Sequence, residues 1–191
     1  MPKMSEEDFI KQAMQYAKQG DAPSQRIVGY WYSKHAKSDS DYEKSFYWFN
    51  KASEQGDAEA TGALGHLYFN GRGVPEDWEK AINLYTKAAD QGDAAAQYSL
   101  AQCLESGNLD NKVAWEINAL TYYKLSADQG NIHAQFRLGE MHLYGTGVEK
   151  SFKHAALWIN LARNNSNYPE DDPTKGEAEK LWNENELWKY E

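Results

Sequence analysis

Apolar residues between positions 56 and 91 recur with the period of an α-helix, in two stretches separated by a glycine-containing segment. The first stretch follows the spacing i, i+4, i+7, i+8, and the second stretch has the same helical period. The positions are Ala60, Leu64, Leu67 and Tyr68 in the first stretch and Trp78, Ala81, Ile82, Tyr85, Ala88 and Ala89 in the second. The pattern predicts two amphipathic helices, which we call helix A and helix B.

A short motif marks where one helix pair ends and the next begins. Gln-Gly-Asp starts at residues 19, 55 and 91, and Gln-Gly-Asn starts at residue 129, so the Asp and Asn positions are 36, 36 and 38 residues apart. Such intervals are typical of two-helix repeats. Glycine can adopt the left-handed conformation that ends a helix, and Asp or Asn can accept hydrogen bonds from the free N–H groups of the next helix. Each motif is therefore predicted to end a helix B and to start a helix A.

The connections inside the repeats differ from one another. In the second repeat we expect Pro75, Glu76 and Asp77 in the first turn of helix B, because proline lacks the donor that this turn cannot use and acidic residues favour the positive end of the helix dipole. The first repeat has "KHAKS" (34–38) where a glycine turn belongs, and the third gains two residues in "GNLDNKVAWEI" (107–117). Irregular loops are expected at both places.

Aligning the repeats on the motif predicts which side chains form the core. An apolar column contains Val28, Leu64, Leu100 and Leu138, and the next column contains only small residues, Gly29, Gly65, Ala101 and Gly139. Small residues at one level of every helix A predict close contact between helices. Cys103 shares a column with large apolar residues and is predicted to be buried and unreactive, and His142 is predicted to fill interior space rather than to bind a metal.

The stretch "LGHLYFNGRGVPEDWEKAINLYTKAADQGDA" (64–94) closely resembles the Sel-1-like repeat family, and "LGEMHLYGTGV" (138–148) carries the same resemblance in the fourth repeat. The resemblance covers about residues 20–163 and implies an all-α, right-handed α-solenoid of stacked helix-turn-helix repeats, related to the tetratricopeptide repeats. Helices of about a dozen residues are marginal alone, so stacking must stabilise them. We expect one domain, 1–191, made of an N-terminal capping helix (1–19), four repeats (20–55, 56–91, 92–129, 130–165) and a loop with a C-terminal capping helix (166–191).

The composition limits which kinds of partner and which cellular location are expected. The chain of 191 residues has a net charge of −9, which disfavours binding to nucleic acid. It contains no run of eighteen apolar residues and begins with an acidic, not apolar, segment, so neither membrane insertion nor a signal peptide is expected. A single cysteine fits a reducing compartment, and a cytoplasmic location is predicted. The acidic segment from Glu170 to Glu191 carries an apolar stripe and is expected to seal the last repeat.

Motifs that carry chemistry are missing. "GRGVPE" (71–76) and "GTGVEK" (145–150) begin like a dinucleotide fingerprint, but both lack the third glycine and follow no strand pattern. Neither G-x-S-x-G, H-E-x-x-H nor Ser-x-x-Lys occurs. A non-enzymatic protein without a cofactor or a metal site is predicted.

Helix A is expected to line the inner, concave face, by analogy with tetratricopeptide arrays. The partner-binding positions predicted there are Arg26, Tyr30, Lys34, His66, Phe69, Tyr98, Gln102, Glu105, Phe136, Glu140, Leu143 and Tyr144. The set predicts a basic end in the first repeat and an acidic end in the third and fourth, with Phe69 and Tyr144 as anchors. The resemblance implies a protein-binding adaptor or scaffold, with a bacterial immunity protein that neutralises a toxin as the alternative.

Overall fold

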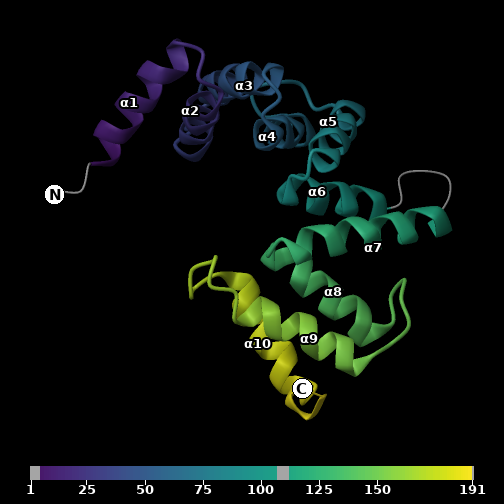
Figure 1. Cartoon of the computed structure of the whole chain (residues 1–191). Helices are drawn as coiled ribbons and strands as arrows, with labels where there is room; N and C mark the ends of the chain where they lie inside the picture. Colours follow the sequence, from purple (N-terminus) through teal and green to yellow (C-terminus); the bar gives the residue numbers. More distant parts are fainter. Residues whose placement is uncertain (1–4, 107–111, 191) are drawn as a thin grey trace. The chain divides into compact units, whose positions relative to one another are not determined.

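The computed structural model describes residues 5–106 and 112–190, with the side chains of 112–118 excepted. The start of the irregular loop expected in the third repeat, residues 107–111, lies outside this range. The described residues form helices and no strands, as the sequence predicts (Figure 1). The helices are α1 (Glu6–Lys18), α2 (Ala22–Lys34), α3 (Asp39–Glu54), α4 (Ala58–Phe69), α5 (Trp78–Asp90), α6 (Ala94–Glu105), α7 (Lys112–Asp128), α8 (Ile132–Tyr144), α9 (Phe152–Arg163), α10 (Pro173–Glu184) and the 3₁₀ helix η1 (Leu187–Tyr190).

The chain forms two compact units, Met1–Ala96 and Gln97–Glu191, which we call the N-terminal and the C-terminal unit. In the N-terminal unit α1 packs on α2, α2 on α3, α3 on α4 and α4 on α5. In the C-terminal unit α7 packs on α8, α8 on α9 and α9 on α10 (Figure 1), and η1 contacts α9 and α10. This nearest-neighbour packing is the all-α repeat arrangement that the periodicity predicts.

The Gln-Gly-Asp motif has the predicted structure. Its glycines, Gly20, Gly56, Gly92 and Gly130, have φ values of +99°, +89°, +93° and +85°. The following residue caps the next helix: Asp57 Oδ1 accepts from the N–H of Ala60 at 2.9 Å, and Asn131 Oδ1 accepts from the N–H of Ala134 at 3.1 Å. Each motif therefore ends a helix B and starts a helix A.

The start of helix B in the second repeat differs from the prediction. Helix α5 begins at Trp78, and Asp77 is its N-cap, with Oδ1 accepting from the N–H of Lys80 at 3.0 Å. Pro75 and Glu76 precede the helix. The carboxylate of Asp77 satisfies a free N–H of the first turn, so Asp77 acts as the cap rather than as a helical residue.

The predicted contact between helix A and helix B is present at the small-residue column. A Cβ atom added to Gly29 would lie 2.6 Å from Cδ1 of Phe49, and one added to Gly65 would lie 2.8 Å from Cδ1 of Tyr85. In both repeats an aromatic side chain of helix B thus lies directly against the backbone of helix A. The apolar column beside it is buried throughout: Val28, Leu64, Leu100 and Leu138.

A second periodic feature, a column of buried amides, was not predicted. Gln25 Nε2 donates to the backbone oxygen of Ala17 at 3.1 Å, and Gln135 Nε2 donates to that of Ala127 at 3.2 Å. In the second repeat Thr61 holds this position, and its hydroxyl shares a hydrogen bond of 2.7 Å with the hydroxyl of Ser53. Each of these bonds joins a helix A to the helix B before it, and so fixes the register between repeats.

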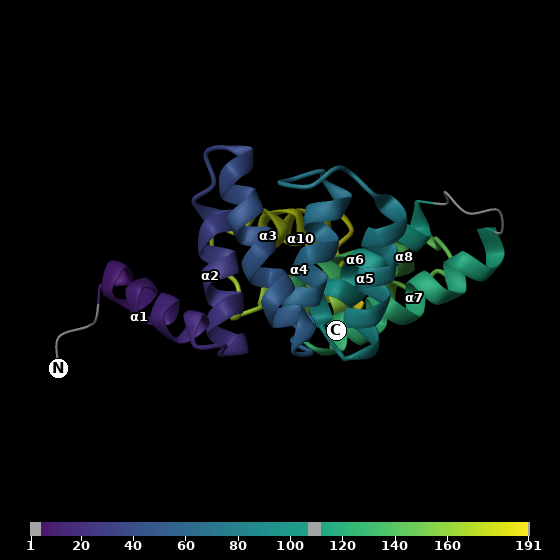
Figure 2. The same ribbon diagram turned by 90° about the horizontal axis from the view of Figure 1, so that it is seen from above.

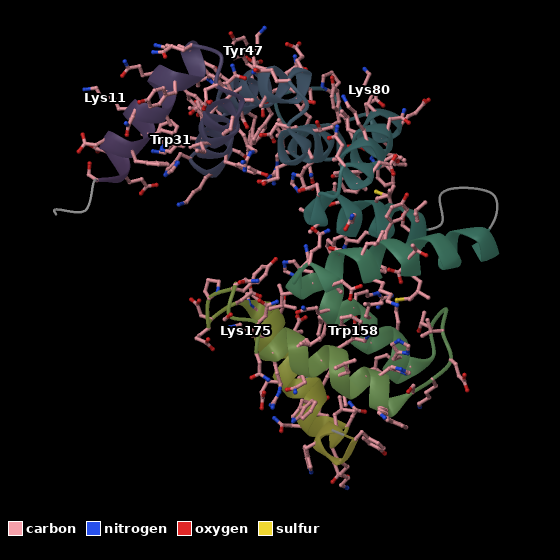
Figure 3. The ribbon with its side chains drawn as sticks, in the orientation of Figure 1. Lys11, Trp31, Tyr47, Lys80, Trp158 and Lys175 are labelled. Carbon is pink, nitrogen blue, oxygen red and sulfur yellow. The ribbon has the colours of Figure 1, made fainter. Side chains whose placement is uncertain are left out.

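The C-terminal helix seals the last repeat. Ala178, Trp182 and Leu187 are buried in one core with Ile159 of α9. The guanidinium of Arg163 lies over the Trp182 ring, 4.3 Å from its centre. Lys175, labelled in Figure 3, is also buried, and its Nζ donates to Glu170 Oε1 at 3.1 Å.

Cys103 is less buried than the sequence predicts. Leu67 and Met141 of its column are buried, but Cys103 is only partly buried. It lies in the last turn of α6. Burial still raises the pKa of its thiol. His142 is also partly buried, with its ring centre 4.9 Å from that of His154.

Candidate functional site

The exposed side of the A helices forms one surface in each unit. The N-terminal A surface comprises the predicted residues of α2 and α4, namely Arg26, Tyr30, Lys34, His66 and Phe69. The C-terminal A surface comprises those of α6 and α8, namely Tyr98, Gln102, Glu105, Phe136, Glu140, Leu143 and Tyr144. The Asp or Asn caps set where each helix A begins, and residues three, four and seven positions apart then share one face.

Arg26 is neutralised inside the N-terminal unit rather than offered to a partner. Its Nε lies 3.0 Å from Asp57 Oδ2, and its Nη1 pairs with Glu59. The adjacent Tyr30 has its pKa raised to about 12, because burial, together with the carboxylates of Glu59 and Asp93, disfavours a phenolate. Lys34 Nζ lies 3.8 Å from Glu6 Oε1. The basic end predicted for this surface is therefore balanced by acidic neighbours.

The aromatic side chains of the N-terminal A surface differ in their exposure and in their contacts with other rings of the chain. Tyr30 is 46% exposed and meets Phe49 edge to face, with ring centres 4.9 Å apart. Phe69 is partly buried and stacks on Trp78 of α5 at 5.1 Å, so it already has an intramolecular partner. His66 is exposed overall, but partial desolvation of its ring and the charge of Arg72 lower its pKa. The ring that is open to a partner here is Tyr30, rather than the predicted anchor Phe69.

An ion-pair network organises the C-terminal A surface. Glu105 accepts hydrogen bonds from the Tyr123 hydroxyl at 2.7 Å and from Arg137 Nε at 3.2 Å. Arg137 Nη1 also donates to Glu140 Oε2 at 3.2 Å. Burial works to raise the pKa of Glu105, but the bonds from Arg137 and Tyr123 outweigh it and lower the pKa. Both carboxylates of the predicted acidic end thus share one arginine that the sequence reasoning missed.

Rings and amides form a row beside this network. The ring of His133 lies 5.7 Å from that of Tyr98 and 5.9 Å from that of Tyr168. Gln102 Nε2 donates to the Tyr98 hydroxyl at 2.9 Å, and His133 Nδ1 lies 2.9 Å from the Thr174 hydroxyl oxygen. His133 was missed, although its column varies in chemistry (Pro23, Glu59, Ala95, His133), which is the signal that singled out His66.

Leu143 was assigned wrongly to the partner-binding set. It is 2% exposed and belongs to the core that also contains Trp182 and Leu187. The capping helix α10 packs on α8 as well as on α9, and so this side of the last helix A is covered. Phe136 packs against the same core and is partly buried. Tyr144 is 58% exposed and is the open ring of this surface.

Within residues 5–106 and 112–190, no three or more His, Cys, Asp or Glu side chains are grouped so that they could hold a metal ion. None of the helices in the same part of the chain is long and apolar enough to cross a membrane. The A surfaces instead offer tyrosine rings, amides and locally balanced ion pairs, a mixture that is typical of protein-binding surfaces.

The repeats match a known family. The model of the Sel1 repeat fits residues 22–57, 58–93, 94–131 and 132–167. Among solved structures, a protective antigen of uropathogenic Escherichia coli with an SLR fold is 31% identical, with a TM-score of 0.69 over 82% of this chain and 33% of its own. A Sel1 repeat protein from Oxalobacter formigenes is 29% identical, with a TM-score of 0.63 over 76% of this chain and 59% of its own. The chain thus spans about a third and about three fifths of these two proteins.

More distant comparisons add nothing about function. An immunity protein from Pseudomonas aeruginosa covers 98% of this chain and 85% of its own, but it is 17% identical with a TM-score of 0.39, a likeness too low to carry an argument. No curated protein matches the chain in sequence.

Proposed function

The chain belongs to the Sel1-repeat family, and we propose that it is a non-enzymatic adaptor that binds a protein partner through the exposed side chains of its A helices. The observation that carries the proposal is the exposure of Tyr30 and Tyr144, one on each A surface. Tyrosine supplies a large, rigid contact area at low entropic cost, and binding energy in protein interfaces concentrates in such residues.

The ion pairs beside the tyrosines support this role in a second way. Arg26 and Arg137 are each held by two acidic side chains within their own unit. Side chains that are already ordered lose less conformational entropy when a partner binds, and so they preorganise the surface. Balanced charges steer a partner weakly over long distances, so we expect affinity to depend on the tyrosines more than on electrostatic attraction.

The test begins with affinity purification of the partner from native cells and measures its dissociation constant by titration calorimetry. Tyr30→Ala combined with Tyr144→Ala should weaken binding at least tenfold, equivalent to about 1.4 kcal/mol, without changing the helical circular dichroism. Tyr47→Ala is the matched control, because Tyr47 is 52% exposed but lies on helix B (α3; Figure 3). Loss of binding in the control, with full affinity in the double variant, would place the partner on the B helices and refute the proposal.

A further inference from the structure

A groove of about 600 Å³ lies between α1 and the C-terminal half of α2, and none of its lining residues belongs to the N-terminal A surface. It lies wholly within the N-terminal unit. Its apolar lining comes from Ile10 and Met14 of α1 and from Trp31 and Tyr32 of α2. The rings of Trp31 and Tyr32 meet edge to face at 5.1 Å, and Trp31 also lies 4.9 Å from the ring of His35, so the aromatic wall is preformed.

The groove leaves partly exposed a position that the second and fourth repeats bury. Trp31 aligns with Leu67 and Met141, which are buried, and with Cys103, which like Trp31 is partly buried. In the second repeat the glycine loop brings Val74 onto the core that contains Leu67. The first repeat has the short connection 35–38 instead, with no apolar residue of that size in it. The aromatic wall is thus core-like in composition and lacks an apolar cover like Val74, although Lys44 Nζ lies 5.6 Å from the centre of the Tyr32 ring.

Within the described residues of the N-terminal unit, α1 packs on α2 and on no later helix of that unit with more than a few contacts. Figures 1 and 2 show α1 beside α2, with its far side clear of the other helices of the N-terminal unit. A helix could therefore approach along α1 without displacing any part of this unit.

Two lysines give the groove its charge. Lys11 and Lys18 line it from α1, are exposed, and are two helical turns or about 10 Å apart along the axis. Across the described residues of the chain, neither lysine takes part in an ion pair, whereas Lys34 and Arg26 nearby do. An uncompensated positive pair beside an apolar wall, in a chain of net charge −9, is complementary to an acidic amphipathic segment.

We infer that the α1–α2 groove is a second docking surface and that it takes an acidic amphipathic helix of a protein partner. The apolar face of that helix packs on Ile10, Met14, Trp31 and Tyr32, and two carboxylates spaced i, i+7 meet Lys11 and Lys18, since that spacing has the same rise as the lysine pair. This inference does not rest on the A surfaces, and the two can fail separately.

The probe is a synthetic, fluorescein-labelled helical peptide of about 15 residues, with Leu at i, i+4 and i+7 and Glu at two flanking positions seven residues apart. Its binding to the full chain is followed by fluorescence anisotropy. Lys11→Glu with Lys18→Glu should weaken binding about tenfold, whereas the control Lys87→Glu with Lys153→Glu, which changes two exposed lysines elsewhere by the same charge, should leave it unchanged. A peptide with Lys in place of Glu should prefer the groove variant, and the acidic peptide should slow hydrogen exchange in α1.

Three results would overturn the inference. The first is no binding of the acidic peptide to the unmodified chain. The second is an equal loss of affinity in the groove variant and in the control variant, which would mean unspecific attraction. The third is self-association of the unmodified chain in sedimentation velocity that the groove variant abolishes, which would make the occupant a second copy of this chain.

Discussion

Gly65 is a position where the fold should tolerate a larger side chain poorly. It is buried in α4, and a Cβ atom added there would lie 2.8 Å from Cδ1 and Cε1 of Tyr85 and 3.2 Å from the backbone oxygen of Ala81. Carbon atoms in contact prefer a separation of about 3.5 Å or more, so even one methyl group requires the Tyr85 ring to move by roughly 0.7 Å. The ring is itself buried, which limits that movement.

Two opposing effects determine how much Gly65→Ala changes the free energy of unfolding. Alanine gains about 1 kcal/mol in helix propensity, while overpacking by a methyl group costs about 1–3 kcal/mol. The net change should therefore lie between about zero and 2 kcal/mol of destabilisation. The third repeat accommodates Ala101 in this column, with Tyr123 at the position of Tyr85, which favours the lower end of that range. Gly65→Leu adds three more carbon atoms at the same place and should cost more than about 3 kcal/mol.

The assay is urea unfolding followed by circular dichroism and tryptophan fluorescence. Gly176→Ala is the matched control, because it lies in α10 and a Cβ atom there would meet nothing within 4 Å. It has the same gain in propensity without the contact, so it should be stabilised by up to about 1 kcal/mol. A Gly65→Leu protein within about 0.5 kcal/mol of the unmodified chain would refute the packing argument. So would an equal loss of stability in the Gly176→Ala control.

Two further predictions concern titration. Burial and the nearby carboxylates of Glu59 and Asp57 raise the pKa of Asp93, so its folded form holds a proton more tightly than its unfolded form, and stability is lost as pH rises through the raised pKa. Asp93→Asn keeps a capping oxygen, as Asn131 does, and should remove that loss, so in urea unfolding the stability at pH 7 relative to pH 3.5 should be higher in the variant than in the unmodified chain; a lower relative stability at pH 7 in the variant would contradict this. Because burial raises the pKa of the Cys103 thiol, a thiol reagent should label it more slowly in the folded chain than in urea at the same pH, and equal rates would count against this expectation.

The helices and their ends could be predicted because their signals are local in sequence. A Gly followed by Asp or Asn acts within one turn on either side, so aligning the repeats was enough to place Asp57 and Asn131 as caps. The same alignment identified Gly65 as a contact point, because a small residue recurs there in every repeat. Pro75 was predicted in the first turn of α5, but the helix begins three residues later, at Trp78, because Asp77 serves as its N-cap.

The partners of surface side chains could not be predicted from the columns. Arg26 pairs with Asp57, which lies 31 positions further along the chain, and the choice depends on how the side chains of two helices reach one another. Phe69 looked free because its partner Trp78 follows the intervening loop. Leu143 looked exposed because the capping helix that covers it lies outside the repeat pattern. A repeat alignment describes what repeats share, and each of these contacts is particular to one repeat.

The buried bonds that join consecutive repeats restrict how such an array can lengthen by duplication. One kind of junction couples the backbone oxygen of Ala127 to the amide of Gln135, and the other couples the hydroxyl of Ser53 to that of Thr61. A threonine opposite an alanine would keep its bond to a backbone oxygen at the start of its own helix, as Thr61 does to that of Asp57, whereas a serine opposite a glutamine would lose the hydroxyl partner of its buried oxygen, at a cost of about 1–3 kcal/mol. An inserted copy is therefore least costly where its first helix and the helix before it carry matching residues, and an unlike junction that buries a lone serine hydroxyl should lower the stability of the longer array.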